Sequence, residues 1–241
     1  MTPRKPALPG KLAFGWREAM KKPKLRFVAL AVLVLAASII GGVVAWLSDG
    51  ATAKREITTG NVDIRLVDEA WNADLARNVK PNTFLPRSPK VTNLGSNDAY
   101  VFITLEIAAL PEGTELHSGT GMARSGVGTP LYTTQAASGL AYDNADWTWV
   151  SGGLRDGRIT QVYAYARNNA MVPLRQGQTT PSVFDRVRLA NVDSVTALIG
   201  VDPSITVSAY GIQATELGSA GGITSPLDVW NIVSNYQNTR K

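Results

Sequence analysis

The sequence predicts a mainly β fold: an antiparallel, jelly-roll-like β-sandwich with loop insertions, an N-terminal hydrophobic helix before it and a short C-terminal helix at its end. Three observations predict this fold. From about residue 57 onward, apolar residues recur with a period of two. Short segments rich in β-branched and aromatic residues are separated by Gly, Asn, Asp, Pro and Ser, with no helical segment between successive strands. A long charge-free apolar run precedes them all.

The first 26 residues hold the positive charge of the chain. They carry eight basic residues against one acid, a net charge of +7, whereas all 241 residues sum to +5. The remainder is therefore mildly acidic, at −2. A domain that binds duplex nucleic acid needs lysine and arginine gathered on its folded surface. We therefore expect no nucleic-acid partner.

The basic leader is followed by 21 uncharged residues, 27–47, with the sequence FVALAVLVLAASIIGGVVAWL. A run of this length behind basic residues predicts insertion into a membrane, with the basic flank remaining cytoplasmic. Gly41-Gly42 weakens the helix, and Val43-Val44-Ala45 places small residues at positions −3 and −1 of a cut. We expect signal cleavage between Ala45 and Trp46 and export of the rest to the cell surface or medium. Retention as a membrane anchor is the alternative.

These features divide the chain into a leader and signal peptide (1–45), a connecting segment (46–59) and a sandwich domain (60–241). Within the domain, alternation or β-branched and aromatic content predicts strands in five places. They are the segment around Val62, Ile64 and Leu66, then 99–107, 158–167, 182–189 and 205–214.

Two further segments complete the predicted domain. Residues 108–157 are rich in Gly and Ser around GTELHSGTGMARSGVGTP, which predicts exposed loop inserted between strands. Near the end, Ser225 can cap a helix, Pro226 suits its first turn and Asp228 favours its positive terminus. In that helix Val229, Val233 and Tyr236 fall on one face, with Leu227 and Trp230 beside them.

The composition argues against an enzyme and against a cofactor. The chain has no cysteine, which removes disulfides, zinc–thiolate sites and thiol nucleophiles. It has one histidine, His117, in a polar glycine-rich context without a G-x-S-x-G motif, so we expect an exposed loop histidine and no catalytic residue. Asp143, Asn144 and Asp146 could offer oxygen ligands to calcium, but turn formation explains them as well, and we assign no metal.

Two tryptophans stand two positions apart, Trp147 and Trp149. In a strand this spacing puts them on one face. That face could bind a glycan or a protein partner, or it could be a core face of the strand. The second interpretation is the simpler one.

Several motifs, in order along the chain, resemble the TasA/camelysin family of secreted proteins from Gram-positive bacteria. The apolar run ends in Ala45-Trp46-Leu47-Ser48-Asp49, and the turn and strand GNVDIRL follow at 60–66. A proline turn and the step VTNLGS lie at 79–96, and DAYV opens the next strand at 98–101. TPSVFDRV at 180–187, AYGIQA at 209–214 and Trp230 resemble the late strands and the C-terminal tryptophan.

This resemblance implies a jelly-roll subunit of an extracellular fibre or biofilm matrix, processed by a SipW-type signal peptidase. In fibre-forming members, the segment freed by cleavage leaves its own subunit and pairs with the sheet of the next, so the partner is another copy of the chain. Residues 46–59 (WLSDGATAKREITT) are the candidate donor strand, with Trp46, Leu47 and Ile57 as the apolar residues that are unfavourable in water. A solvated linker is the alternative interpretation of this segment.

Two rival functions remain. A membrane-tethered monomeric sandwich could act as an adhesin or binding module. Camelysin relatives have also been called metallopeptidases, but HExxH zinc binding requires two histidines one helical turn apart, and His117 is the only one.

Overall fold

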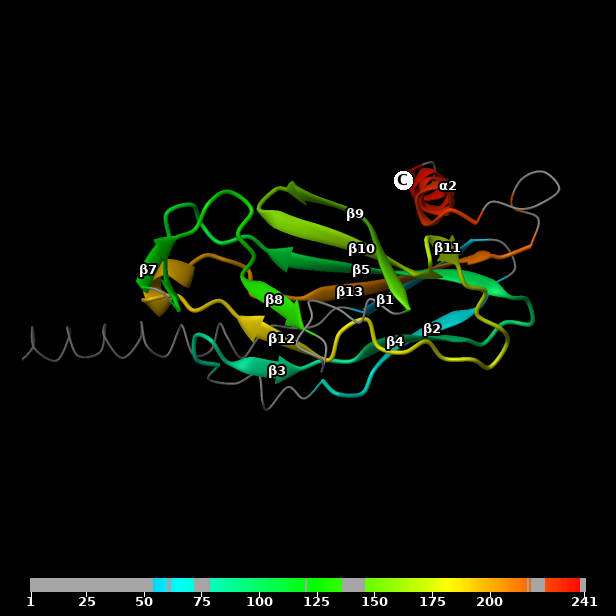
Figure 1. Ribbon diagram of the computed structural model, residues 1–241, viewed down its shortest axis with the longest axis horizontal. Helices are drawn as coiled ribbons and strands as arrows, with labels where there is room; N and C mark the ends of the chain where they lie inside the picture. Colours follow the sequence, from blue (N-terminus) through cyan, green and yellow to red (C-terminus); the bar gives the residue numbers. More distant parts are fainter. Residues whose placement is uncertain are drawn as a thin grey trace, which may run out of the picture. The chain divides into compact units, whose positions relative to one another are not determined.

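Strands are the main secondary structure of the computed structural model, which confirms the mainly β prediction. The structure describes residues 54–59, 62–71, 79–119, 121–135, 146–215, 217 and 224–238, and for 54–59 and 237–238 it describes the backbone alone. These residues all belong to one compact unit, 43–241. They form several antiparallel sheets and one α-helix, as expected for a β-sandwich (Figure 1).

The largest sheet has six strands in the order β1-β13-β5-β10-β11, with β9 also paired to β10. Their bounds are β1 Lys54–Thr59, β5 Ala99–Ala108, β9 Trp147–Arg155, β10 Arg158–Arg167, β11 Ala170–Met171 and β13 Thr206–Gln213. The predicted strands at 158–167 and 205–214 are therefore confirmed as β10 and β13.

A second layer lies against one face of this sheet, below it in Figure 1. It contains the pair β2-β4 and the three-stranded sheet β3-β12-β8. The bounds are β2 Ile64–Asp68, β3 Phe84–Pro86, β4 Pro89–Asn93, β8 Tyr132–Gln135 and β12 Arg186–Leu189. The predicted strand at 182–189 is thus shorter at its start, where the Ser182 hydroxyl donates to the Asp185 carboxylate instead.

The main core fills the space between the two layers. Alternate residues of β5 (Val101, Ile103, Leu105 and Ile107) are almost completely buried there. The sequence predicted a half-buried β5, but its other face is buried too. Tyr100 and Phe102 on that face belong to a second cluster, which helix α2 covers.

Helix α2 spans Pro226–Asn238, in agreement with the prediction of a C-terminal helix that begins after Ser225. The Val229 amide donates to the Ser225 carbonyl at 3.1 Å. Val229 and Val233 are buried against the large sheet, whereas Tyr236 and Leu227 are exposed. The predicted apolar face is therefore buried at Val229 and Val233 but exposed at Tyr236.

The middle segment 108–157 is not the simple loop insertion that its glycine content predicted. It contains the hairpin of β6 (Glu115–Ser118) and β7 (Gly121–Arg124), as well as β8 and β9. The hairpin residues are mostly exposed, and main-chain pairing within the hairpin and with 191–193 holds it. The glycine content of this segment therefore predicted exposed residues correctly. It was wrong in predicting loop where the structure has strands.

One strand pair departs from the predicted antiparallel arrangement. β1 pairs with β13 in parallel, with Lys54 opposite Val207 and Thr59 opposite Ile212. Antiparallel neighbours can be joined by a tight turn, whereas parallel strands need a long connection. Almost the whole domain lies between β1 and β13, so no hairpin constrains the direction of this strand.

The predicted leader, the apolar run 27–47 and the cleavage residues Ala45 and Trp46 lie outside the described residues. Within the described part of the chain, no helix has both the length and the apolar character needed to cross a membrane.

Candidate assembly edge

β13 is the strand against which the N-terminal strand lies, and its two faces differ. Val207 and Ala209 point into the main core and are almost completely buried. Tyr210 and Ile212 belong to the opposite face, where Trp230 of α2 meets the Tyr210 ring at a centroid distance of 5.5 Å. Both faces of β13 are therefore covered by other parts of the domain, and only its lateral edge accepts another strand.

β1 occupies this edge with a polar sequence, KREITT. In register, Glu56 is opposite Ala209 and Ile57 is opposite Tyr210. Ile57 is the one apolar residue of the strand. The structure describes β1 through its parallel main-chain pairing with β13.

The chain is fixed again immediately after β1. The Asp63 carbonyl accepts hydrogen bonds from the Leu94 and Gly95 amides at 2.8 and 2.9 Å. A Cβ atom on Gly95 would lie 2.8 Å from the Asp63 nitrogen, so this close approach requires glycine. Two residues, Gly60-Asn61, separate Thr59 from the fixed Val62–Asp63 position. Any movement of β1 away from its domain must therefore turn at these two residues.

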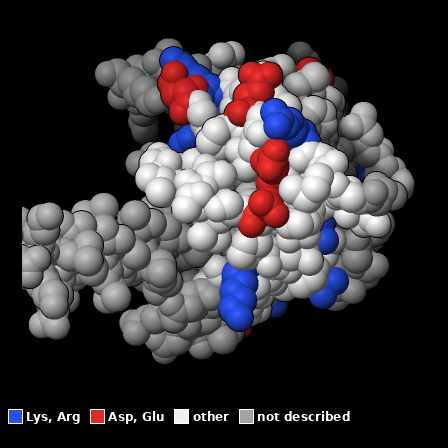
Figure 2. Space-filling view, turned by 90° about the vertical axis from the view of Figure 1, so that its left-hand side faces the viewer, with Lys and Arg blue, Asp and Glu red and all other residues white. Residues whose placement is uncertain are grey.

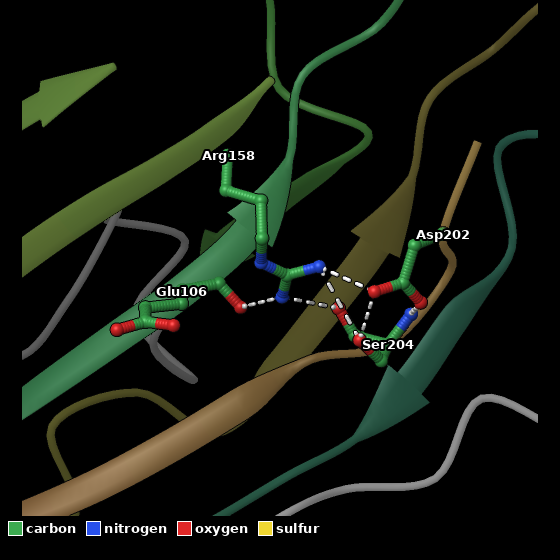
Figure 3. Close-up of polar contacts among 4 residues, drawn as sticks. All are labelled: Glu106, Arg158, Asp202 and Ser204. Atoms are coloured by element: carbon green, nitrogen blue, oxygen red, sulfur yellow. Dashed lines mark hydrogen bonds and ion pairs between the residues drawn. The ribbon is translucent and has the colours of Figure 1, made fainter. Parts of the chain in front are cut away.

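A polar clamp holds the start of β13 (Figure 3). The Arg158 guanidinium, at the start of β10, donates through Nη1 to Asp202 at 2.7 Å and through Nη2 to the Glu106 and Ser204 carbonyls, both at 3.1 Å. Asp202 in turn accepts from the Ser204 amide at 2.9 Å and from its hydroxyl at 2.8 Å. The clamp joins β5, β10 and the segment that leads into β13, and so positions the edge that β1 meets.

The clamp predicts a pH-dependent contribution to stability. Burial opposes ionisation of Asp202, but the hydrogen bonds from Ser204 and the charge of Arg158 outweigh it, so the pKa of Asp202 is lowered from 3.8. A carboxyl with a lowered pKa stabilises the fold above its unfolded pKa and loses that effect as the pH falls through the folded value. Asp202→Asn should therefore lower the free energy of unfolding at pH 7 by up to about 1 kcal/mol, since this pair is largely exposed.

Urea denaturation of both proteins across a pH series measures this effect. The difference between wild type and Asp202→Asn should shrink below pH 3.8. Asn keeps an oxygen acceptor for the Ser204 amide, so the variant removes the charge and the hydrogen bonds that Oδ2 accepts. A difference that stays constant down to pH 2 would assign the effect to packing instead.

The structure also places the other residues singled out in the sequence. His117 lies in β6 and not in a loop, half exposed, with its Nε2 2.8 Å from the Asp193 carboxylate. In the described part of the chain, no group of three His, Asp or Glu residues could hold a metal ion. Asp146 pairs with Arg167. Asp143 and Asn144 lie outside the described residues.

The two tryptophans of β9 have different environments. Trp147 is a core residue, 1% exposed, and its Nε1 donates to the Pro181 carbonyl at 3.1 Å. Trp149 is 52% exposed. The core interpretation is therefore right for Trp147 and wrong for Trp149. Of the predicted donor residues, Trp46 and Leu47 lie outside the described residues, and Ile57 is in β1.

Charge is mixed on the end of the domain that carries β7. Figure 2 shows acidic and basic side chains close to one another there, with uncharged surface around them. Among the residues described on this face, the basic side chains form no continuous surface of the kind that follows a phosphate backbone.

Comparison of the chain with family models, with curated proteins and with solved structures finds no match. The fold and the geometry of the β13 edge are therefore the basis on which a function is proposed.

Sequence reasoning missed the clamp and the direction of β1. The D-x-S spacing of Asp202 and Ser204 is a weak signal for a local side-chain turn. The third member, Arg158, is 44 positions away from Asp202, and no local pattern connects them.

Proposed function

We propose that this protein is an exported structural subunit of an extracellular fibre or biofilm matrix, and that subunits assemble by exchange of the N-terminal strand. The observation that carries the proposal is the β1–β13 pair. A polar N-terminal strand occupies the edge of the large sheet through main-chain pairing, next to a short connection that contains glycine. The family resemblance of the sequence supports the same function, and a jelly-roll topology and signal cleavage between Ala45 and Trp46 belong to the proposal.

Exchange replaces a contact within one chain by the same contact between two chains. The main-chain hydrogen bonds to β13 are identical in both cases, so the two states differ mainly in the strain of the connection and in the entropy of association. Residues 46–53, which include Trp46 and Leu47, precede β1 in the mature chain. If the neighbouring subunit buries these two side chains, each contributes about 1.5 to 3 kcal/mol.

The geometry of exchange favours filaments. Each subunit has one donor strand and one acceptor edge, and the two are different surfaces. Such a head-to-tail contact continues indefinitely unless the rotation between subunits closes a ring. Because the chain has no cysteine, the joints of the polymer are held by pairing and packing alone.

Replacing residues 54–59 by a six-residue Gly/Ser segment should abolish assembly. The replacement keeps the chain length and the cleavage region but removes the side chains and much of the strand propensity of β1. Wild-type exported protein should sediment as polymers and show filaments by electron microscopy, whereas the variant should remain a folded monomer. A peptide of residues 46–59 added in trans should bind the variant, and a scrambled peptide of the same composition is the control.

Two outcomes would contradict the proposal. Filaments formed by the Gly/Ser variant would show that assembly uses another surface. A wild-type protein that stays monomeric at high concentration, with β1 on its own β13, would instead support the membrane-tethered monomeric module.

A further inference from the structure

The outer face of the three-stranded sheet β3-β12-β8 carries two arginines of β12. Val187 and Leu189 of this strand are completely buried in the main core, so Arg186 and Arg188 lie on the opposite, outer face. In register, Arg186 stands between Pro86 of β3 and Gln135 of β8, and Arg188 between Phe84 and Thr133.

Both guanidinium groups lie against the ring of Phe84. The Cζ atom of Arg186 is 4.5 Å from the ring centroid and that of Arg188 is 5.7 Å from it. The ring itself is 41% exposed. We name Phe84, Arg186 and Arg188 the β12 platform.

The platform has no acidic partner in the described part of the chain: no carboxylate there lies within ion-pair distance of either arginine. The Arg186 Nε atom is enclosed and has no hydrogen-bond partner. Two like charges two positions apart on one strand repel each other, and an enclosed N–H without an acceptor is unfavourable. Ion pairing within the described part of the chain therefore does not explain why both residues are arginine.

A groove continues from the platform toward the β6–β7 hairpin. Its lining includes Arg188 together with hydroxyl, amide and imidazole groups: Thr133, Asn82, Asn191, Ser118 and His117. None of the lining residues that the structure describes is acidic, and His117 contacts Asp193 beside the groove. The groove thus combines hydrogen-bonding groups with one unpaired guanidinium.

We propose that the β12 platform and this groove bind an acidic polysaccharide. Arginine recognises carboxylates through two parallel hydrogen bonds, and it does so while stacked on an aromatic ring. The exposed part of Phe84 offers an apolar contact to the C–H groups of a sugar ring. The amides and hydroxyls of the groove match sugar hydroxyl groups. The platform belongs to the layer opposite β1, and the inference does not depend on strand exchange.

Two other polyanions fit less well. Duplex DNA or RNA binds through many phosphate contacts, but the described basic side chains here are two arginines and a histidine that already contacts Asp193. Recruitment to an anionic membrane takes clusters of about four to eight basic residues. A few cations beside one aromatic ring and neutral polar groups suit a sugar carboxylate better.

Binding of the full-length chain, in mild detergent, to immobilised polygalacturonate tests the proposal. Arg186→Gln/Arg188→Gln should weaken binding at least tenfold, and Phe84→Leu should weaken it several-fold. The matched control Arg65→Gln/Arg175→Gln removes the same charge elsewhere and should change affinity less than twofold. The basic leader is the same in every variant, so a difference between the two double variants comes from the folded domain. Thermal unfolding checks that each variant is folded.

Methyl-esterified polygalacturonate, which keeps the sugar backbone and loses the charge, should not bind through the platform. Several results would overturn the proposal: equal loss in both double variants, undiminished binding of the esterified polymer, or no binding above that of a neutral dextran. Equal or stronger arginine-dependent binding of polyglutamate would identify an acidic peptide as the ligand instead. Arg188→Lys should restore only part of the affinity, because lysine keeps the charge but loses the planar stacking.

Discussion

Asp68→Ala is expected to lower the free energy of unfolding by about 3 to 5 kcal/mol, the usual effect of leaving one partner of a buried ion pair alone. Asp68 and Arg87 are buried side chains, 1% and 0% exposed, and their Oδ2 and Nε atoms are 2.6 Å apart. Burial lowers the pKa of Arg87, and the Asp68 carboxylate opposes that shift by stabilising the charged guanidinium. Removing the carboxylate leaves this charge enclosed in the domain.

Asp68 also connects the end of β2 to the two residues between β3 and β4. Its Oδ1 atom accepts from the Ser88 amide at 2.8 Å, and Trp71 stacks on Arg87 with 4.6 Å from Cζ to the ring centroid. The alanine variant therefore loses the ion pair and leaves the Ser88 amide without its acceptor.

Chemical denaturation of Asp68→Ala beside Asp156→Asn measures the effect. Asp156 is 92% exposed and its carboxylate is 3.6 Å from Arg155, and asparagine tolerates the positive φ of 50° at this position, so its replacement should change stability by less than about 1 kcal/mol. The double variant Asp68→Leu/Arg87→Met replaces both charges by apolar groups and should be more stable than Asp68→Ala. A loss below about 1 kcal/mol in Asp68→Ala would show that the pair is solvated in solution.

Trp147→Ala is expected to have a similar effect, a loss of about 3 to 5 kcal/mol, because a large buried ring leaves a cavity. The Trp147 ring packs on Tyr165 at a centroid distance of 5.7 Å. Its Nε1 hydrogen bond to Pro181 ties β9 to the segment before β12. The variant therefore loses both apolar contact and a link between the two layers.

Trp149→Ala is the matched control for this prediction, because the same residue type two positions later is half exposed. It should lower stability by less than about 1 kcal/mol. Equal losses in the two variants would contradict the burial difference between them.

Local patterns in the sequence predicted the elements whose burial is simple. β10 matches its predicted bounds, because RITQVYAYAR combines strand-forming residues with turn signals on both sides. Helix α2 follows from its cap and its first-turn proline. In both cases the signal lies within the element itself.

Features that depend on distant segments could not be predicted in the same way. β5 is buried on both faces because α2, more than a hundred residues later, covers its outer face. Asp68 and Arg87 are 19 positions apart, and no periodicity pairs them. The β12 arginines resembled ordinary polar positions of a strand until the register placed Phe84 beside them.

The direction of β1 is another feature that the sequence could not predict. Residues 46–59 were compatible with a donor strand or with a linker, because KREITT alternates weakly and has one apolar residue. A strand held at an edge by main-chain pairing needs little apolar content of its own. Its parallel partner is specified by the free edge of β13.

Cysteine crosslinking at the β1–β13 register tests strand exchange most directly. Arg55 and Ser208 are register partners, and adjacent strands lie close enough for a disulfide. The chain has no cysteine of its own, so a mixture of Arg55→Cys and Ser208→Cys proteins contains one reactive thiol per subunit. Arg55→Cys mixed with Thr133→Cys, on β8, is the control.

After co-assembly and oxidation, strand exchange predicts covalent dimers that contain one chain of each variant, and few such dimers in the control mixture. The double variant Arg55→Cys/Ser208→Cys should form covalent ladders in assembled fibres. If assembled fibres of the mixed single variants give no mixed dimer, while the double variant crosslinks only within its own chain, β1 stays on its own subunit and assembly by strand exchange is contradicted.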